Sequence, residues 1–195
     1  IVSREGEVFA AKFPNGTLAL APHLRTFEED WGGGFVRKAE QDTKSLEGRE
    51  LPTDQLHLKD QHLAGHVLSY DGIGSLSFRP ADGGLIAFAG QNCNVLTLDG
   101  KDYRFAEQPL GFICFAPVPE ERRVPGGAVF QLMVHGGGTV KIPAPGLSGT
   151  YAAYLEGATQ GAKGAETPIT VENGTLTITI DGSNAGRWIY LVPRA

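Results

Sequence analysis

Short apolar runs that end in turn residues are the feature that most constrains the fold of this chain. In the clearest case the runs Pro168–Val171 and Thr175–Ile180 flank Glu172-Asn173-Gly174, and Thr alternates with apolar residues along the second run. Such alternation puts one face of a strand on the core and the other in solvent. Asn and Gly readily take the positive φ of a two-residue hairpin turn. Pro14-Asn15-Gly16 and Asp99-Gly100 have the same character, so the sequence predicts antiparallel hairpins.

Runs of this kind recur about every dozen residues, which is typical of sandwiches and barrels. The 27 glycines and 12 prolines are spread between the runs, as turns in an all-β protein would be. The one helical candidate, Arg37–Leu51, lacks an apolar stripe at helical spacing and is expected to be a loop with at most one helical turn. The sequence therefore predicts an all-β fold, an antiparallel, jelly-roll-like β-sandwich with about 12–14 short strands and little helix.

Four finer expectations follow from the same pattern. Asp71-Gly72 is predicted to be a turn, and Gly136-Gly137-Gly138 a hairpin turn before the next strand. Gly111–Ala116 is nearly all apolar, so we expect it to lie centrally between two layers. Gly157–Glu166 is small and polar and is predicted to be an irregular, mobile loop.

The charged linker Pro119–Pro125 suggests a soft domain boundary. We expect residues 1–118 to form the main β-sandwich. Residues 119–195 would supply strands that complete this sandwich or form a small second β-domain. Both arrangements are compatible with the pattern.

The formal net charge of −5 argues against a nucleic-acid partner or an anionic membrane surface, which would require a basic face. No signal peptide and no run of about 18 apolar residues is visible, so no membrane segment is expected. The chain opens on Ile1 rather than Met. We therefore expect a processed product or a piece of a longer chain, either cytoplasmic or secreted.

The sequence offers little for catalysis or for metal binding. Cys93 and Cys114 lie in apolar runs and are read as buried thiols, with a disulfide left open. His62 and His66, if on one strand, would lie about 13 Å apart, too far to share a metal ion. We therefore expect no metal and no cofactor. A catalytic reading would rest on the loop acids Glu28, Glu29 and Asp30, with Asp54, Asp60 and Asp71 as further carboxylates.

Thr26–Phe35 is the best candidate for a functional segment, because it gathers three acids, aromatic rings that include Trp31 and Phe35, and three consecutive glycines. Rings stack on the apolar faces of sugars and acids accept hydroxyl hydrogens, while Trp and Arg are also enriched at protein interfaces. The bland alternative is a surface loop anchored by a buried Trp31. The predicted carbohydrate-binding or interface residues are His23, Arg25, Asp30, Trp31, Phe35 and Arg37.

Several segments resemble the accessory, non-catalytic β-sandwich domains of bacterial multidomain glycoside hydrolases. They are Phe13–His23, Gly126–Phe130, Val140–Pro143, Thr175–Ile180 and Trp188–Val192. The resemblance implies a bacterial domain that packs against a catalytic domain of the same polypeptide or of a partner subunit. Such a domain can also contact carbohydrate. It assigns no catalytic residue to this chain.

Three functions stay open on the sequence. The first is an accessory domain of a carbohydrate-active enzyme, itself non-catalytic, whose parent protein is a glycoside hydrolase. The second is a free-standing carbohydrate-binding module. The third is a small glycan hydrolase or lyase that uses the acids at positions 28–30.

Overall fold

The computed structural model describes residues 2–5, 8–22, 26–30, 36–39, 55–123, 126–159 and 162–195. These residues form antiparallel β-structure with one short 3₁₀ turn, η1 (Glu120–Arg122). The all-β, sandwich-like fold is as the sequence predicts. The strands are β1 (Val2–Glu5), β2 (Val8–Lys12), β3 (Leu18–Pro22), β4 (Thr26–Asp30), β5 (Val36–Ala39), β6 (Gln55–Leu63), β7 (His66–Ala81), β8 (Gly84–Cys93), β9 (Val95–Leu98), β10 (Lys101–Arg104), β11 (Leu110–Pro117), β12 (Phe130–His135), β13 (Gly138–Pro143), β14 (Tyr151–Glu156), β15 (Lys163–Thr167), β16 (Ile169–Glu172), β17 (Thr175–Ile180) and β18 (Ile189–Pro193).

The strands make one large sheet and two small ones. The large sheet runs in the order β1-β2-β3-β7-β8-β11-β12-β18-β14-β15, and β6, β9 and β10 join it through β7. A three-stranded sheet has the order β13-β17-β16, and β4 pairs with β5 in a sheet of two strands. Within the part of the chain that the structure describes, no helix has the length and apolar character of a membrane span.

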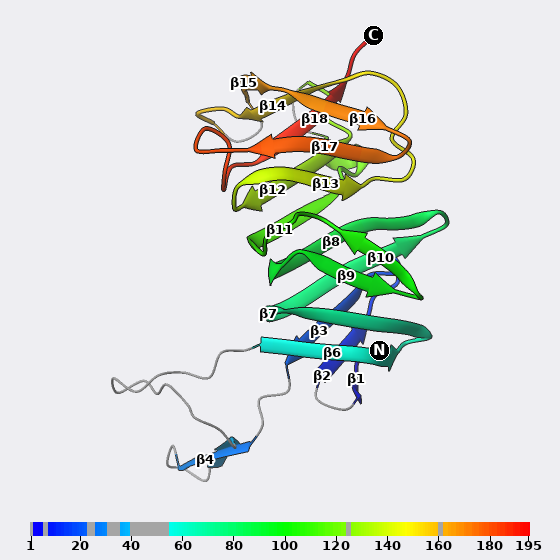
Figure 1. Ribbon diagram of the computed structural model, residues 1–195, viewed down its shortest axis with the longest axis vertical. Coiled ribbons are helices and arrows are strands. Elements are labelled where there is room, and N and C mark those ends of the chain that lie inside the picture. The colour runs from blue at the N-terminus through cyan, green and yellow to red at the C-terminus, as the bar shows by residue number, and fades with distance from the viewer. Residues whose placement is uncertain are drawn as a thin grey trace.

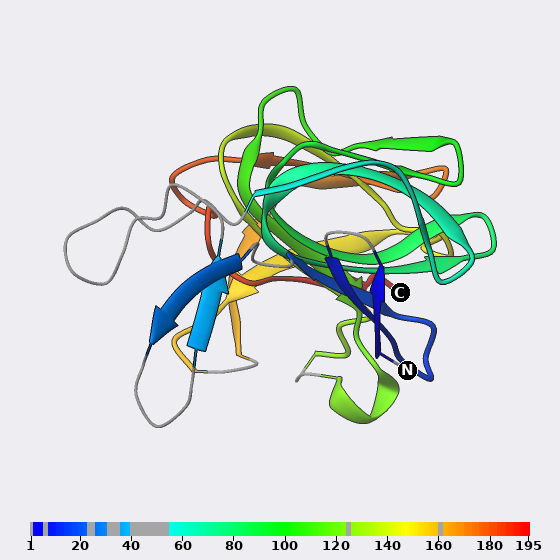
Figure 2. The same cartoon turned by 90° about the horizontal axis from the view of Figure 1, so that it is seen from below.

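The sandwich has two layers, seen face-on in Figure 1 and from below in Figure 2. One layer is the long path from β1 to β15. The other contains β6, β9 and β10, followed by β13, β17 and β16 (Figure 1). The strand β7 belongs to both layers, because Leu68–Tyr70 pairs with β9 while Leu76–Phe78 pairs with β3.

The change of layer occurs at Gly72 and Gly74, inside β7. The predicted turn at Asp71-Gly72 is therefore wrong: the chain bends there without reversing and remains in one strand of 16 residues. Gly74 has φ +71, and a Cβ on Gly72 would lie 2.1 Å from the hydroxyl oxygen of Tyr70. Glycine is needed here because the packing is close and because the backbone has an unusual φ. In a sequence, a glycine that is present for either reason cannot be told from a glycine in a turn.

A single hydrophobic core lies between the layers. On the large sheet it contains Phe78, Phe88 and Phe115, and on the facing layer Leu96 and Ile178, all buried. Phe105 joins the aromatic group, with its ring centroid 4.7 Å from that of Phe88 and 5.9 Å from that of Phe115. Most contributing strands, such as β9, β12 and β17, alternate buried and more exposed positions, as a half-buried strand requires, whereas β18 buries Ile189, Tyr190 and Leu191 in succession.

The strand Leu110–Pro117 was expected centrally, and it does pair on both sides, with β8 and with β12. Its Ile113 and Phe115 face the core, whereas Phe112 and Cys114 are only half-buried. β11 is therefore central within its sheet, but the other layer covers only one of its faces. The residues of its other face are apolar although they are only half-buried.

The predicted hairpins at the Asn-Gly and Asp-Gly turns are confirmed. Glu172 pairs with Thr175 across Asn173-Gly174, whose φ values are +49 and +70. Leu98 pairs with Lys101 across Asp99-Gly100, with φ +51 and +76. Positive φ at both central residues is the two-residue turn that matches strand twist. The β2–β3 hairpin closes where Phe13 N donates to Thr17 O at 2.9 Å.

The prediction of a hairpin turn at Gly136–Gly138 is wrong. β12 pairs with β11 and β18, whereas β13 pairs with β17 in the other layer, so these glycines carry the chain between layers. A Cβ on Gly136 would lie 2.9 Å from a methyl carbon of Leu110, and Gly138 has φ +91. The crossing thus needs glycine for close approach as well as for conformation.

Several described strands fall where none was expected. β4 and β5 include part of the segment predicted to be a loop, with Asp30 opposite Val36. β15 occupies Lys163–Thr167, inside the predicted mobile segment, and pairs with β14. With β1, these additions give eighteen strands in the described ranges instead of twelve to fourteen. The domain boundary near residue 119 stays a prediction, although β11 and β12 pair directly across it.

Candidate functional site

Two adjoining hollows open on the outer side of the second layer, where β10 runs beside β13. The first has a volume of about 550 Å³ and is lined by residues 104–108, 137–139 and 141. The second, of about 480 Å³, is lined by residues 83, 101–104, 141, 143, 145 and 173–175. Both hollows share Arg104 and Lys141. We call the two together the seam groove, because β10 and β13 belong to different sheets (Figure 1).

Strand alternation explains which side chains face the groove. On β10, Tyr103 is buried, so its neighbours Asp102 and Arg104 point outward. On β13, Val140 and Ile142 are buried, which turns Lys141 outward. The amide of Lys141 donates to the carbonyl of Phe105 at 2.8 Å. This bond connects the two sheets and brings Arg104 and Lys141 to adjacent strands.

The wall of the first hollow is held by hydrogen bonds from Asn94 and by the buried ring of Phe105. Asn94 donates through its side-chain amide to the carbonyls of Ala106 (3.1 Å) and Glu107 (3.2 Å). Its own carbonyl accepts from Phe105 N at 2.7 Å. The Phe105 ring beneath the loop is 1% exposed. A loop fixed at both its backbone and its core side chain gives a preformed wall rather than a flexible one.

Cations outnumber acids in the seam groove. Arg104 and Lys141 are exposed, and neither side chain has a hydrogen-bonding or ion-pair partner among the residues that the structure describes. Lys101 donates to Gly83 O at 3.2 Å and lies over the Tyr103 ring, 5.3 Å from its centroid. The acids are Asp102 and Glu107.

Asp102 is turned toward β9, since it accepts a hydrogen bond from the Thr97 hydroxyl at 2.7 Å. Burial raises the pKa of the Tyr103 phenol, so it stays neutral at the groove floor. The groove is therefore cationic around Arg104 and Lys141, in a chain whose formal net charge is −5.

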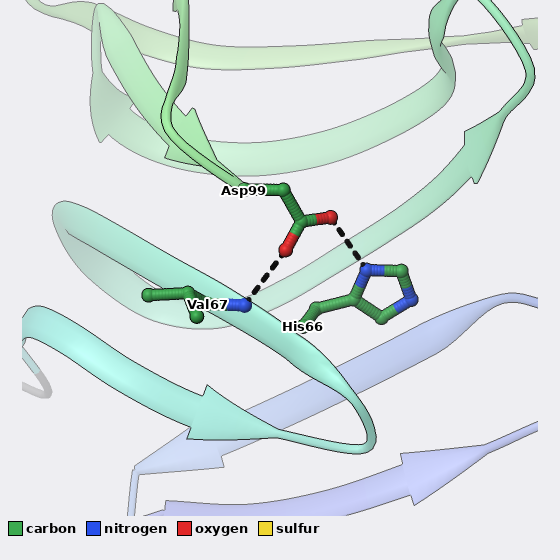
Figure 3. Close-up of polar contacts among 3 residues, drawn as sticks. All are labelled: His66, Val67 and Asp99. Carbon is green, nitrogen blue, oxygen red and sulfur yellow. Dashed lines mark hydrogen bonds and ion pairs between the residues drawn. The ribbon is translucent and has the colours of Figure 1, made fainter.

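A second polar cluster joins two hairpin turns (Figure 3). The two carboxylate oxygens of Asp99 contact His66 Nδ1 at 2.8 Å and Val67 N at 2.9 Å. The His66 hydrogen bond and then that from Val67 lower the pKa of Asp99. Asp99 lies in the β9–β10 turn and His66 directly follows the Ala64-Gly65 turn. Because both oxygens are occupied within the fold, the cluster is a clasp between hairpins.

A third cluster is buried beside the bend of β7. The Tyr70 hydroxyl donates to Gln91 O at 3.2 Å and accepts from Gln91 N at 3.3 Å. Burial raises the pKa of Tyr70, and it raises the pKa of the neighbouring Cys93 thiol to about 11. A protonated, buried thiol is a structural group rather than a nucleophile.

The two cysteines are free. Cys93 lies opposite Leu110, and Cys114 lies opposite Ala89, four residues away along β8. This offset corresponds to about 13 Å, whereas a disulfide needs Cα atoms within about 7 Å. The sequence left open whether the two cysteines are free thiols or form a disulfide, and in the structure they are free thiols.

Most of the sequence-predicted site lies outside the described residues. His23, Arg25, Trp31 and Phe35 are in that group. The backbones of the other two, Asp30 and Arg37, belong to β4 and β5, where Arg37 is opposite Glu29. The predicted carbohydrate-binding or interface role of these six residues stays a prediction.

The argument against a metal site placed His62 and His66 on one strand, but His62 lies in β6 and His66 begins β7. They flank a tight turn, with His62 opposite Val67 and Leu63 opposite His66, so the two imidazoles lie on opposite faces of the hairpin. Among the described side chains no three His, Cys, Asp or Glu come together as a metal-binding group. Of the other candidate acids, Asp60 exchanges hydrogen bonds with Ser69, and Asp54 lies outside the described part.

The comparisons with known proteins returned nothing: no family model, no curated protein and no solved structure matches this chain. The function therefore has to be argued from the residues themselves. Sequence reasoning missed Arg104 and Lys141, which it treated as scattered cations. The sequence shows only that each is a cation next to apolar residues of a predicted strand, and it has no signal that brings the two together.

Proposed function

We propose that this protein is a non-catalytic accessory domain of a carbohydrate-active enzyme, and that it contacts carbohydrate through the seam groove. In this proposal it packs against a catalytic domain of the glycoside hydrolase type, on the same polypeptide or on a partner subunit. The resemblance of its β-segments to such accessory domains motivates the enzyme context. The groove carries the carbohydrate part.

The groove suits a polyhydroxylated chain for three reasons. Its two hollows adjoin, so an extended ligand can occupy both. Each volume lies within the range of about 300–1,000 Å³ typical of ligand sites. The rim offers the hydroxyls of Thr139 and Thr175 and the amide of Asn173, which can both donate to and accept from sugar hydroxyls.

A blocking substitution tests this use of the groove. Thr139 is exposed on β13 and lines the first hollow, so Thr139→Trp should fill that hollow without touching the core. Thr170→Trp is the matched control, because Thr170 is exposed on β16 of the same sheet and lines neither hollow. On a glycan array, the wild type and Thr170→Trp should bind the same glycans, and Thr139→Trp should lose them at an unchanged melting temperature.

Binding that survives Thr139→Trp would refute the groove, and an array without any bound glycan would refute carbohydrate contact. The enzyme context has a separate test, which is the complete reading frame and the proteins that co-purify with its product. A catalytic domain on the same polypeptide or in a stable complex is the expected result. A complete protein that binds glycan without either would instead be a free-standing carbohydrate-binding module.

A further inference from the structure

We infer that the seam groove selects acidic polysaccharides, whose uronate carboxylates bind between Arg104 and Lys141. This inference rests on the proposed function and adds the chemical class of the ligand. It starts from position: these two cations line both hollows, so they lie where the hollows meet. A chain that occupies both hollows must pass over them.

The second observation is that the side chains of Arg104 and Lys141 have no binding partner among the residues that the structure describes. Arg104 and Lys141 are exposed and make no side-chain hydrogen bond or ion pair with any residue that the structure describes. Arg194, by contrast, pairs with Glu166. Arg104 and Lys141 occupy adjacent strands joined by the bond from Lys141 N to Phe105 O at 2.8 Å. Two adjacent, unpaired cations leave a charge that an anionic ligand would compensate.

The carboxylates around the groove offset that charge only in part, because two of them line the groove against three cations. Asp102 is directed at Thr97 on β9, with 2.7 Å between the two side-chain oxygens. Glu107 lines only the first hollow, on the wall held by Asn94. Lys101 adds a third cation at the far end of the second hollow, fixed by Gly83 O at 3.2 Å. Cations thus extend from the junction of the two hollows into the second hollow.

The lack of exposed aromatic rings in the groove favours acidic over neutral sugars as its ligands. Neutral glycans are held largely by exposed aromatic rings that stack on their apolar faces. The aromatic residues that line this groove, Tyr103 and Phe105, are 6% and 1% exposed, so their rings are unavailable for stacking. Recognition here must come from hydrogen bonds and charge, and Arg offers a planar, two-pronged donor that matches a carboxylate.

The experiment compares polygalacturonate with its fully methyl-esterified form, which keeps the backbone and removes the charge. Isothermal titration of the full chain should show binding of the acid form, at least tenfold weaker binding of the ester, and loss of affinity as NaCl is raised. Arg104→Gln with Lys141→Gln should weaken binding of the acid form by at least tenfold, because hydrogen bonds to charged groups are the strong ones. The control is Arg122→Gln with Arg123→Gln, which removes two exposed cations near η1 that line neither hollow and should leave binding unchanged.

Four results would overturn the inference. Equal affinity for the acid and the ester would show that charge is not read, and would leave the proposed function intact. Equal effects of the two double variants would show a diffuse charge effect without a site, and tight binding of poly-glutamate would show that the groove takes acidic peptides. If neither form nor any neutral glycan binds, the proposed function fails as well. Circular dichroism of each variant separates loss of binding from loss of fold.

Discussion

Replacing Gly72 with Ala tests how β7 passes between the layers. A Cβ at this position would lie 2.1 Å from Tyr70 Oη, 2.3 Å from Tyr70 Cζ and 2.7 Å from the carbonyl oxygen of Gln91. Non-bonded carbon atoms are optimally about 3.5–4.0 Å apart, so something must move. Tyr70 is 3% exposed and its hydroxyl bonds both backbone groups of Gln91, which leaves the ring little room.

The magnitude follows from three terms. Forcing an extra carbon into a packed site costs about 1–3 kcal/mol. Displacing the Tyr70 hydroxyl from Gln91 costs about 0.5–1.5 kcal/mol more. Against these, Ala stabilises by about 0.4–1 kcal/mol because it restricts the unfolded chain. We therefore expect Gly72→Ala to lower the free energy of unfolding by about 0.5–4 kcal/mol, centred on about 2 kcal/mol, against the 5–15 kcal/mol typical of a domain.

Urea unfolding followed by circular dichroism measures this loss. Gly182→Ala is the matched control, since a Cβ there meets no heavy atom within 4 Å and the backbone φ of Gly182 is not positive. The control should stay within about 0.5 kcal/mol of the wild type. If Gly72→Ala unfolds at the same urea concentration as Gly182→Ala, the close packing of Tyr70 over Gly72 does not hold β7 in place.

Three further predictions concern the clasp, the thiols and a turn. The pKa of Asp99 is lowered below its unfolded value of about 3.9, so its carboxylate stabilises the fold above that pH and the contribution is lost as the pH falls through the folded pKa. Asp99→Asn should accordingly unfold more easily than the wild type at pH 6, with the gap closing by pH 2, and a gap that persists at pH 2 would contradict the charge argument. Cys93, buried and with a pKa of about 11, should react with a disulfide reagent at pH 8 more slowly in Cys114→Ser than Cys114 does in Cys93→Ser; equal rates would mean that Cys93 is accessible. Asn173 has φ +49, so Asn173→Val should cost about 1–2 kcal/mol in chemical denaturation, and no loss would indicate that the turn tolerates another conformation.

Local rules predicted the hairpins well because their causes are local. An Asn-Gly or Asp-Gly pair fixes the backbone of its own turn, and the two-residue alternation of the flanking strands fixes the register. Asn173-Gly174 and Asp99-Gly100 needed nothing from the rest of the chain. The all-β class followed from the same local facts, repeated along the sequence.

Glycines that serve tertiary packing misled the same reasoning. Gly72 is required by the Tyr70 ring, and Gly136 by Leu110. Tyr70 is close to Gly72 in sequence, but its ring is held in place by Gln91 of β8, and Leu110 lies far from Gly136 in sequence, so a turn rule detects neither contact. A glycine in the sequence therefore indicates that a Cβ is unfavourable at that position, but it does not show whether the cause is the backbone conformation of a turn or a close neighbour. The same ambiguity hid the passage of the chain from one layer to the other at both places.

The seam groove also combines features that the local sequence predicts with one that only the tertiary structure shows. Arg104 follows a hairpin that the sequence predicts, and Lys141 stands between two apolar residues of a strand that it also predicts. Their proximity depends on the crossing at Gly136–Gly138, which places β13 beside β10 instead of beside β12. A chain that reversed there, as the turn rule predicts, would put Lys141 opposite Met133 of β12 in the large sheet, away from Arg104. The groove thus depends on a connection that local rules assign wrongly, and its cations look scattered until that connection is known.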